Sequence, residues 1–211
     1  MFTHTRLTFS DIVYWCTFLF VVVAVGYLLV SLISLGSPED SQYNNSSYLK
    51  KQSHTAIIET SYGTIRINFL RSQAPIAVAN FAQLAQSGFY DKTKFHRVLK
   101  GKLIEGGDPL SREKDKELYG TGGPGYVFED EIRGIPMERG VVAMSNLGRP
   151  RTNGSRFFIQ TADTAPLMEG KYTVFGRVTQ GMGVVDAISA VETDADDIPV
   201  VPVVVDSITV E

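Results

Sequence analysis

An unbroken apolar segment near the amino terminus divides this chain into two unlike parts. Residues 12–35, about 24 positions, contain no charged side chain. As a helix this segment would be roughly 36 Å long at 1.5 Å per residue, and the hydrocarbon core of a bilayer is about 30 Å thick. We therefore predict a transmembrane anchor helix over residues 12–35, preceded by a short tail, residues 1–11.

A signal peptide and a buried core helix both fit the apolar segment less well than an anchor does. A cleavable signal peptide has a shorter apolar region, roughly 7–15 residues, followed by a small-residue cleavage site, and Ser34-Leu35-Gly36 is a poor match to such a site. A helix packed into a soluble core would show a polar face, which this segment lacks. The anchor is therefore the preferred interpretation.

The residues that flank the anchor set its expected orientation. Basic residues near a span determine topology, whereas acidic residues contribute little. Arg6 lies on the amino-terminal side, and the other side reaches Lys50 and Lys51 only after a spacer. We expect a single-pass, type II membrane protein whose remaining chain lies outside the cytoplasm. Residues 36–53, rich in Ser, Asn and Gln, are the expected flexible linker.

The chain after the linker has the pattern of a β-rich domain. Residues 56–59 and 64–69 are two predicted strands joined by a tight turn. Alternation in the second strand places Ile65, Ile67 and Phe69 on one face, as expected for a strand with one buried side.

Two helices and a closing strand complete the expected domain. Pro75 is suited to the first turn of a helix and Gly88 to its end. Four apolar residues fall near one stripe of this helix: Ile76, Phe81, Leu84 and Ala85. A second short helix is predicted over residues 184–191 and a final strand over 203–210. The pattern alone predicts a mainly β domain, an antiparallel barrel or sandwich with two α-helices.

Composition argues against two classes of function. The net charge of −3 gives no electrostatic support for nucleic-acid binding. The single cysteine, Cys16, lies in the apolar segment, and the three histidines are His4, His54 and His96. A histidine–cysteine metal site is therefore not expected.

Three blocks of sequence point to a family. The first, residues 95–109, reads Phe-His-Arg-Val-Leu-Lys-Gly-Lys-Leu-Ile-Glu-Gly-Gly-Asp-Pro, with an arginine inside an alternating strand. The second, residues 140–161, contains Gly-Val-Val-Ala-Met-Ser-Asn-Leu-Gly and Thr-Asn-Gly-Ser-Arg-Phe-Phe-Ile-Gln-Thr. The third, residues 170–176, reads Gly-Lys-Tyr-Thr-Val-Phe-Gly. In order and spacing these blocks resemble the cyclophilin-type peptidyl-prolyl isomerases over residues 54–211, in a membrane-anchored form like those of bacteria.

The resemblance implies both a fold and an activity. The fold is a closed eight-stranded antiparallel barrel with an α-helix across each end. The activity is rotation about the peptide bond before proline in polypeptide partners, which assists their folding and uses no cofactor. Resonance gives that rotation a barrier of about 18–20 kcal/mol. Halfway through rotation the proline nitrogen gains a lone pair. A hydrogen-bond donor aimed at that nitrogen would lower the rotation barrier.

The resemblance also assigns the site. Arg97 matches the family's catalytic arginine, and its permanently charged, planar guanidinium suits the donor role. The implied substrate-binding residues are Leu103, Phe158 and Leu167 around the proline ring, Asn146 for the substrate backbone, Tyr172 as a hydroxyl donor, and Ser145 beside Asn146. Because side chains alternate along a strand, His96 should point away from Arg97 and into the core.

Four cleft positions depart from the usual family pattern. Lys102 replaces an aromatic residue, and Glu105 and Arg156 each replace a glutamine; all three remain substrate-binding candidates. Pro166 stands where cyclosporin-sensitive members carry tryptophan, so we expect weak cyclosporin binding. A carboxylate about 4 Å from Arg97 would attract it by roughly 4 kcal/mol at an effective dielectric of 20. The Glu105 carboxylate would orient the Arg97 guanidinium and compete with the substrate for its donors. Alternatively, Lys102 or Arg156 would draw the carboxylate away from Arg97. The sequence does not decide between these two arrangements.

Functions besides isomerisation remain as alternatives. The domain would be a binding module if it captured proline-containing loops with little or no catalysis, and a structural subunit if the barrel were only a packing surface. A hydrolase is disfavoured because neither Ser145 nor Ser155 lies in a Gly-x-Ser-x-Gly motif. The glycine-rich residues 120–125 lack the ending of a phosphate loop and are expected to lie beside the cleft.

Overall fold

The computed structural model describes residues 54–211. The predicted tail, anchor helix and linker (residues 1–11, 12–35 and 36–53) lie outside this part of the chain. Within residues 54–211, no helix combines the length and apolar character that a bilayer crossing requires.

Nine strands form one antiparallel sheet. They are β1 (Thr55–Thr60), β2 (Gly63–Phe69), β3 (Lys94–Phe95), β4 (Arg97–Leu99), β5 (Leu103–Gly106), β6 (Val141–Met144), β7 (Phe157–Gln160), β8 (Val174–Gln180) and β9 (Val203–Val210). Their order in the sheet is β3-β9-β1-β2-β8-β6-β7-β5-β4, and every pairing is antiparallel. The two strands expected at the start of the domain and the closing strand are confirmed.

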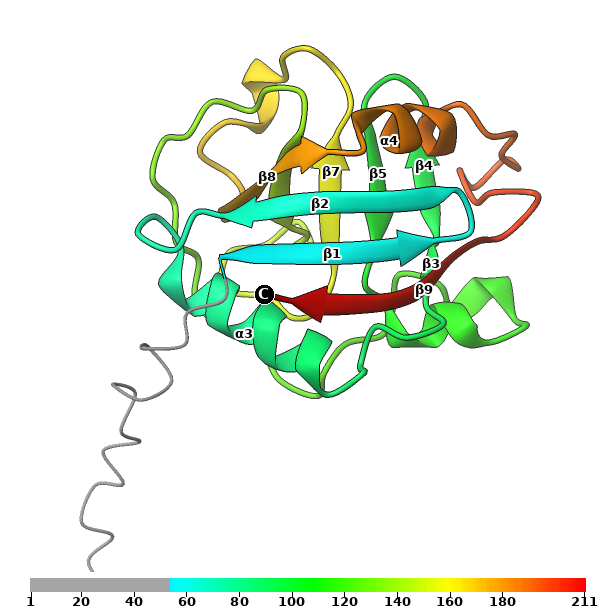
Figure 1. Cartoon of the computed structure of the whole chain (residues 1–211), viewed down its shortest axis with the longest axis horizontal. Coiled ribbons are helices and arrows are strands. Elements are labelled where there is room, and N and C mark those ends of the chain that lie inside the picture. Colours follow the sequence, from blue (N-terminus) through cyan, green and yellow to red (C-terminus); the bar gives the residue numbers. More distant parts are fainter. Residues whose placement is uncertain (1–53) are drawn as a thin grey trace, which may run out of the picture. The chain divides into compact units, whose positions relative to one another are not determined.

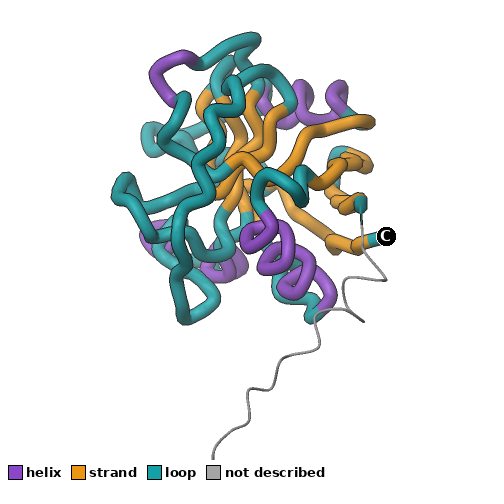
Figure 2. Tube along the Cα trace, turned by 90° about the vertical axis from the view of Figure 1, so that its left-hand side faces the viewer, coloured by secondary structure: helices purple, strands orange, loops and turns teal. Residues whose placement is uncertain are grey.

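The sheet curls into a nearly closed barrel. Its two end strands, β3 and β4, are separated along the chain by His96 alone, so one short segment pairs with β9 at one end and with β5 at the other. The structure thus has nine strands where eight were expected, because the chain changes partner strand at His96. Figure 2 shows the strands together, with much of the loop chain on the side away from the C-terminus.

Two α-helices lie on opposite sides of the barrel (Figure 1). α3 spans Pro75–Gln86, with proline in its first turn, and α4 spans Met182–Ser189. Both helices were expected, although α4 begins and ends two residues earlier than predicted. Three short 3₁₀ helices lie in the loops: η1 (Pro109–Arg112), η2 (Lys116–Leu118) and η3 (Pro166–Met168).

One helix residue does not lie where its pattern predicted. Ile76, placed on the apolar stripe of α3, is 50% exposed. It lies in the first helical turn, where the carboxylate of Glu131 accepts hydrogen bonds from the backbone N–H groups of Ile76 and Ala77 at 3.1 and 2.8 Å. These donors lack partners within the helix, so a buried glutamate from a distant loop caps this end of α3.

An aromatic cluster fills the barrel. The Phe81 ring of α3 lies 5.0 Å from the ring of Tyr90, 5.3 Å from that of Phe157 and 5.1 Å from that of Phe175. All four side chains are fully buried. Aromatic pairs at such centroid distances add to the stabilisation from area burial, so these rings stabilise the fold beyond the apolar area that they bury.

A second, smaller apolar cluster lies apart from the first. Its buried members are Leu103, Met137, Val141, Ala143, Phe158 and Val174. Phe158 follows Phe157 on β7, and adjacent strand residues point to opposite faces. Phe157 therefore lies inside the barrel and Phe158 on its outer face.

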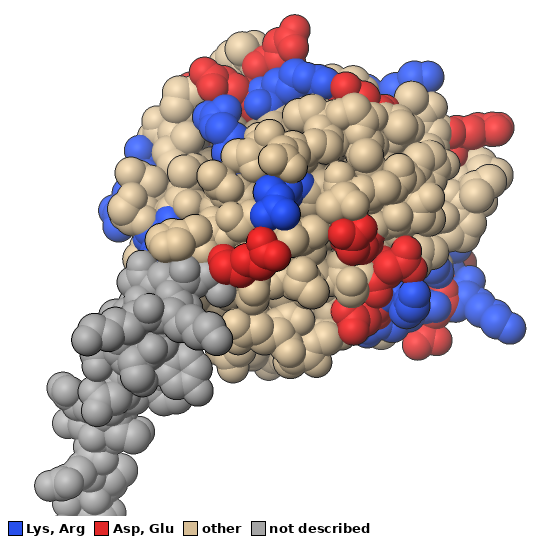
Figure 3. All heavy atoms as spheres, in the orientation of Figure 1, with Lys and Arg blue, Asp and Glu red and all other residues tan. Residues whose placement is uncertain are grey.

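Charges of both signs are interspersed on the face shown in Figure 3, where lysine and arginine lie among aspartate and glutamate. This face has no continuous basic stripe of the kind that accompanies nucleic-acid binding.

Candidate active site

Strand register brings the central candidates into one row. Arg97 of β4 pairs with Glu105 of β5, and Glu105 pairs in turn with Phe158 of β7. Directly paired residues project to the same face of a sheet, with Cβ atoms about 4.5–5.5 Å apart. The row therefore places the arginine on the outer face of the barrel, two strands from the phenylalanine. The Arg97 side chain is 46% exposed.

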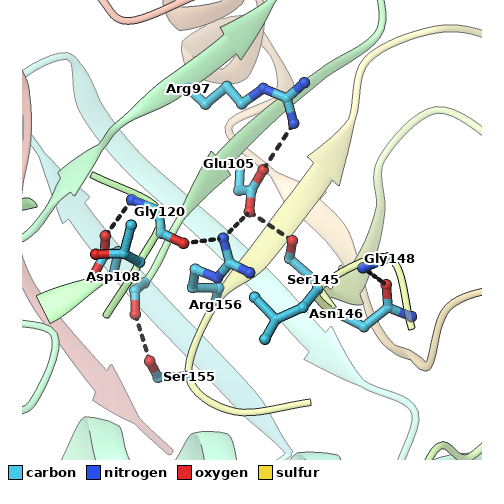
Figure 4. Close-up of polar contacts among 12 residues, drawn as sticks. Arg97, Glu105, Asp108, Gly120, Ser145, Asn146, Gly148, Ser155 and Arg156 are labelled. Carbon is cyan, nitrogen blue, oxygen red and sulfur yellow. Dashed lines mark hydrogen bonds and ion pairs between the residues drawn. The ribbon is translucent and has the colours of Figure 1, made fainter. Parts of the chain in front are cut away.

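Glu105 lies between two arginines (Figure 4). Its Oε2 is 3.5 Å from Arg97 Nη1 and its Oε1 is 3.5 Å from Arg156 Nη1. The hydroxyl of Ser145 donates to the same Oε1 at 2.6 Å. The Glu105 side chain is only 6% exposed, so one buried carboxylate is shared by two cations and a hydroxyl.

The cation that shares Glu105 with Arg97 is Arg156, at the same distance of 3.5 Å. Its Nη1 also donates to the carbonyl of Gly120 at 2.6 Å, and its side chain is only 13% exposed. Lys102 forms no ion pair among residues 54–211; its backbone carbonyl instead accepts from Thr161 N at 2.8 Å. Glu105 therefore stays paired with Arg97, and of the two other cations considered, Arg156 and not Lys102 shares its carboxylate.

Only some of the residues predicted to surround the proline ring belong to one apolar cluster. Leu103 and Phe158 belong to the outer cluster, and the Tyr172 ring packs edge-on against that of Phe158 with centroids 5.1 Å apart. Leu167, on η3, is 86% exposed and is not part of this cluster. Its neighbour Met168 packs there instead, a contact that no motif indicated because it depends on how η3 lies.

The side chain of Asn146 is hydrogen-bonded within the domain, whereas its backbone groups are not. Its Oδ1 accepts from Gly148 N at 3.0 Å, and its Nδ2 donates to the Lys171 carbonyl at 3.1 Å. Among the hydrogen bonds of the described domain, none uses the backbone N–H or carbonyl of Asn146. Within residues 54–211, the backbone N–H and carbonyl of Asn146 are therefore without a hydrogen-bond partner.

A pocket of about 480 Å³ adjoins this segment. It is lined by Thr121, Gly122, Gly123, Pro124, Gly125, Tyr126, Val127, Ser145, Leu147, Thr152, Gly154, Ser155 and Arg156. The prediction that the glycine-rich loop 120–125 lies beside the cleft residues is confirmed.

Buried Asp108 anchors the glycine-rich loop. Its carboxylate accepts from Leu110 N at 2.8 Å and from the backbone N–H of Gly120. A Cβ atom at Gly122 would lie 2.2 Å from Asp108 Oδ1, so only glycine allows the loop to approach the aspartate this closely. The sequence showed that this loop is rich in glycine, but it did not show that Asp108 is the residue that requires glycine at position 122.

His96 is buried behind the row, as expected. Burial lowers the pKa of its imidazole, and the carboxylates of Glu105 and Asp108 oppose that shift in part. The Ser155 hydroxyl donates to the Gly107 carbonyl at 2.8 Å. With Ser145 bonded to Glu105, both serines that invited a hydrolase interpretation donate to other groups, and neither donates to a histidine.

One charged residue near Arg97 was missed from the sequence. Asp197 Oδ2 lies 3.9 Å from Arg97 Nε. The two residues are far apart along the chain, and Asp197 belongs to an acidic run after α4 that has the composition of an ordinary surface loop. No sequence signal identified it, because the contact depends on where that loop crosses β4.

Comparison with known proteins shows which family this chain belongs to. A model described as cyclophilin type peptidyl-prolyl cis-trans isomerase/CLD matches residues 55–210. The chain belongs to this family.

Cyclophilin-type relatives come from distant organisms. Peptidyl-prolyl cis-trans isomerase-like 1 of Neurospora crassa is 44% identical over 145 residues, which cover 67% of this chain and 85% of the relative. Probable peptidyl-prolyl cis-trans isomerase A of Mycobacterium leprae is 42% identical over 178 residues, covering 75% of this chain and 93% of the relative. A crystal structure of a Cryptosporidium parvum cyclophilin type isomerase in the presence of the dipeptide Ala-Pro matches with a TM-score of 0.68 and 32% identity, covering 74% of this chain and 98% of that chain.

Proposed function

We propose that residues 54–211 catalyse cis–trans isomerisation of X-Pro peptide bonds in polypeptides, with Arg97 as the catalytic residue. The observation that carries this proposal is a half-exposed guanidinium, paired with a buried carboxylate, on the sheet face that also bears Phe158. Uncatalysed exchange takes roughly 10–100 s, long enough to limit the folding of a polypeptide.

Arg97 acts on a lone pair that exists only during rotation. In the planar cis or trans bond, the proline nitrogen shares its electrons with the carbonyl. As the bond twists, the nitrogen regains its lone pair and accepts a hydrogen bond from the guanidinium. That bond stabilises the twisted state more than either planar state, which is the condition for catalysis. The guanidinium remains protonated in proteins, so no proton is transferred and no covalent intermediate forms.

The outer apolar cluster seats the proline ring. Half-buried Tyr172 packs against buried Phe158, and with buried Leu103 they form the apolar wall beside the row that contains Arg97. Burial of apolar surface contributes about 25 cal/mol per Å², so these side chains bind the ring without discriminating between its cis and trans forms. The exposed Leu167 lies at the rim, where a bound chain would cover it.

The substrate backbone pairs with Asn146. Its free backbone groups allow a short strand addition, in which main-chain hydrogen bonds give affinity with little dependence on side chains. The neighbouring residues Ser145 and Leu147 line the 480 Å³ pocket, which gives room to a side chain of the same substrate some residues away from the proline.

The sequence pattern of residues 12–35 is what supports a membrane location for the enzyme. In this proposal residues 12–35 anchor a single-pass protein whose catalytic domain faces outside the cytoplasm, where it assists folding of exported polypeptides. Cell fractionation combined with protease treatment of intact cells tests the arrangement. The chain should be found with membranes, and its domain should be digested from outside; recovery in the soluble fraction, or full protection of the domain, would contradict it.

Cyclosporin should bind weakly, because Pro166 at the start of η3 supplies no indole. Titration of the protein with cyclosporin, read by inhibition of isomerase activity, tests this. Pro166→Trp should raise the affinity, while inhibition of the unmodified protein at nanomolar concentrations would show the inference to be wrong.

The deciding experiment is exchange NMR on a short X-Pro peptide with the full chain in detergent micelles. Arg97→Ala should abolish the acceleration. Arg66→Ala is the matched control, because Arg66 is an arginine paired with Glu211 at 3.0 Å on another strand, and it should leave the rate unchanged. Peptide binding without accelerated exchange in the unmodified protein would identify a binding module and reject the enzyme.

A further inference from the structure

The loop between α4 and β9 brings a second carboxylate to Arg97. Glu105 faces Nη1 of the guanidinium at 3.5 Å, whereas Asp197 faces Nε at 3.9 Å. Within residues 54–211, Nη2 has neither an ion-pair partner nor a hydrogen-bond partner. The two acidic groups therefore approach different nitrogens and leave one terminal nitrogen for a substrate.

The backbone fastens Asp197 beside the arginine. The N–H of Val98, the residue after Arg97, donates to the Asp197 carbonyl at 2.8 Å. Asp197 has a φ of +62°, in the left-handed region that non-glycine residues seldom adopt, with aspartate and asparagine the most frequent exceptions. Such a conformation persists only where surrounding contacts impose it, and it is most common at functional sites.

Asp194 supplies those surrounding contacts. Its carboxylate Oδ1 accepts from the N–H groups of Asp196 and Ile198 at 3.2 and 3.0 Å, and its carbonyl accepts from Asp197 N at 3.2 Å. Its Oδ2 pairs with Lys116 of η2 at 2.8 Å. The hydrogen bonds and the ion pair that hold this turn do not involve the Arg97 side chain. The position of the Asp197 carboxylate is therefore set by the loop itself.

We propose that Asp197 is a positioning residue for Arg97, an inference that rests on the proposed function. Its carboxylate holds the Nε side of the guanidinium and so directs the terminal nitrogens toward the substrate. The two carboxylates then have opposite effects. Glu105 takes up a terminal donor that the substrate needs, whereas Asp197 restrains the arginine without occupying one.

Two substitutions remove the charge without disturbing the turn. Asp197→Asn and Asp197→Gly both place residues that tolerate positive φ, so the loop keeps its conformation and the melting temperature should stay the same or rise. kcat/KM should fall about two- to fivefold, the range expected for a half-exposed ion pair. The decrease should lie in kcat, while KM stays the same. Asp196→Asn is the matched control, because it makes the same charge change in the same loop on an exposed residue.

The measurement is X-Pro peptide exchange with the full chain in detergent micelles, together with the Nε–H resonance of Arg97 in ¹⁵N-arginine-labelled protein. The Asp197 variants should shift that resonance and lower kcat, and Asp196→Asn should change neither. Activity of Asp197→Asn equal to that of the unmodified protein, while Arg97→Ala is inactive, would overturn the positioning role alone. Undiminished activity of Arg97→Ala would overturn the proposed function and this inference with it.

Discussion

Adjacent phenylalanines on β7 lie in opposite surroundings. Phe157 points into the barrel, where its ring contacts those of Phe81 and Tyr90 at 5.3 and 5.9 Å. Phe158 lies on the outer face, in register with Glu105 and so in the row that begins at Arg97. The inner face is filled by apolar side chains, while the outer face combines a smaller apolar cluster with charges at defined distances. This contrast predicts that the inner face sets stability and the outer face sets activity.

The largest effect should come from the inner face. Phe157→Ala should lower the free energy of unfolding by about 3–5 kcal/mol, because it leaves a cavity in a closely packed core. Phe158→Ala, one residue away, should cost less stability and should lower the isomerase activity of the folded protein. Urea denaturation and peptide exchange measure the two quantities. Equal losses of stability with no loss of activity in Phe158→Ala would remove the contrast.

The next effect tests the glycine-rich loop, residues 120–125, beside Ser145 and Arg156. Gly122→Ala should destabilise the protein by about 1–3 kcal/mol, the usual cost of forcing extra volume into a packed site, because its Cβ would meet buried Asp108 at 2.2 Å. Gly123→Ala is the control, since nothing lies within 4 Å of a Cβ atom there. Thermal unfolding compares the two variants; equal melting temperatures would show that the contact with Asp108 does not hold the loop.

His96 should make stability depend on pH. Its pKa in the folded protein is lowered, chiefly by burial, so below about pH 6.5 the unfolded chain binds a proton that the folded protein resists. The free energy of unfolding should therefore fall as pH decreases from 7 toward the folded pKa, by at most about 1.4 kcal/mol per pH unit. His96→Gln should flatten this slope in denaturation experiments between pH 5 and 7. An unchanged slope would assign the dependence to other groups.

The smallest effect concerns the shared carboxylate. Glu105→Gln should raise the isomerase activity a fewfold, because Arg97 Nη1 is then freed from a charged competitor 3.5 Å away. Glu138→Gln is the control, since Glu138 pairs with surface Arg177 at 3.2 Å and should have no effect. Peptide exchange measures both variants, and unchanged or reduced activity of Glu105→Gln would contradict the competition argument.

Local patterns predicted much of the fold. The alternation in β2 placed Ile65 and Ile67 correctly in the core, and Pro75 and Gly88 marked the ends of α3. What local patterns missed depends on distant partners. The strand break at His96 follows from pairing with two different strands, and the exposed start of α3 follows from capping by a glutamate of a remote loop.

The site was less predictable than the fold. Motifs identified Arg97 and the departure at Glu105, but sequence could not show which cation shares the carboxylate. That answer, Arg156, depends on the pairing of β5 with β7. Asp197 escaped notice because an acidic loop residue has no distinguishing pattern until the loop is seen to cross β4. Electrostatic partners at this site come from segments whose proximity only the fold reveals.

The central claim is that planar guanidinium donors, and not merely a positive charge, stabilise the twisted peptide bond. Arg97→Lys tests it most directly, because lysine keeps the charge but lacks the rigid fork of donors. In peptide exchange with the full chain, at matched folded content, this variant should lose most of the acceleration, by about tenfold or more, the scale of removing a well-placed transition-state donor. Full activity with lysine at position 97 would contradict the account.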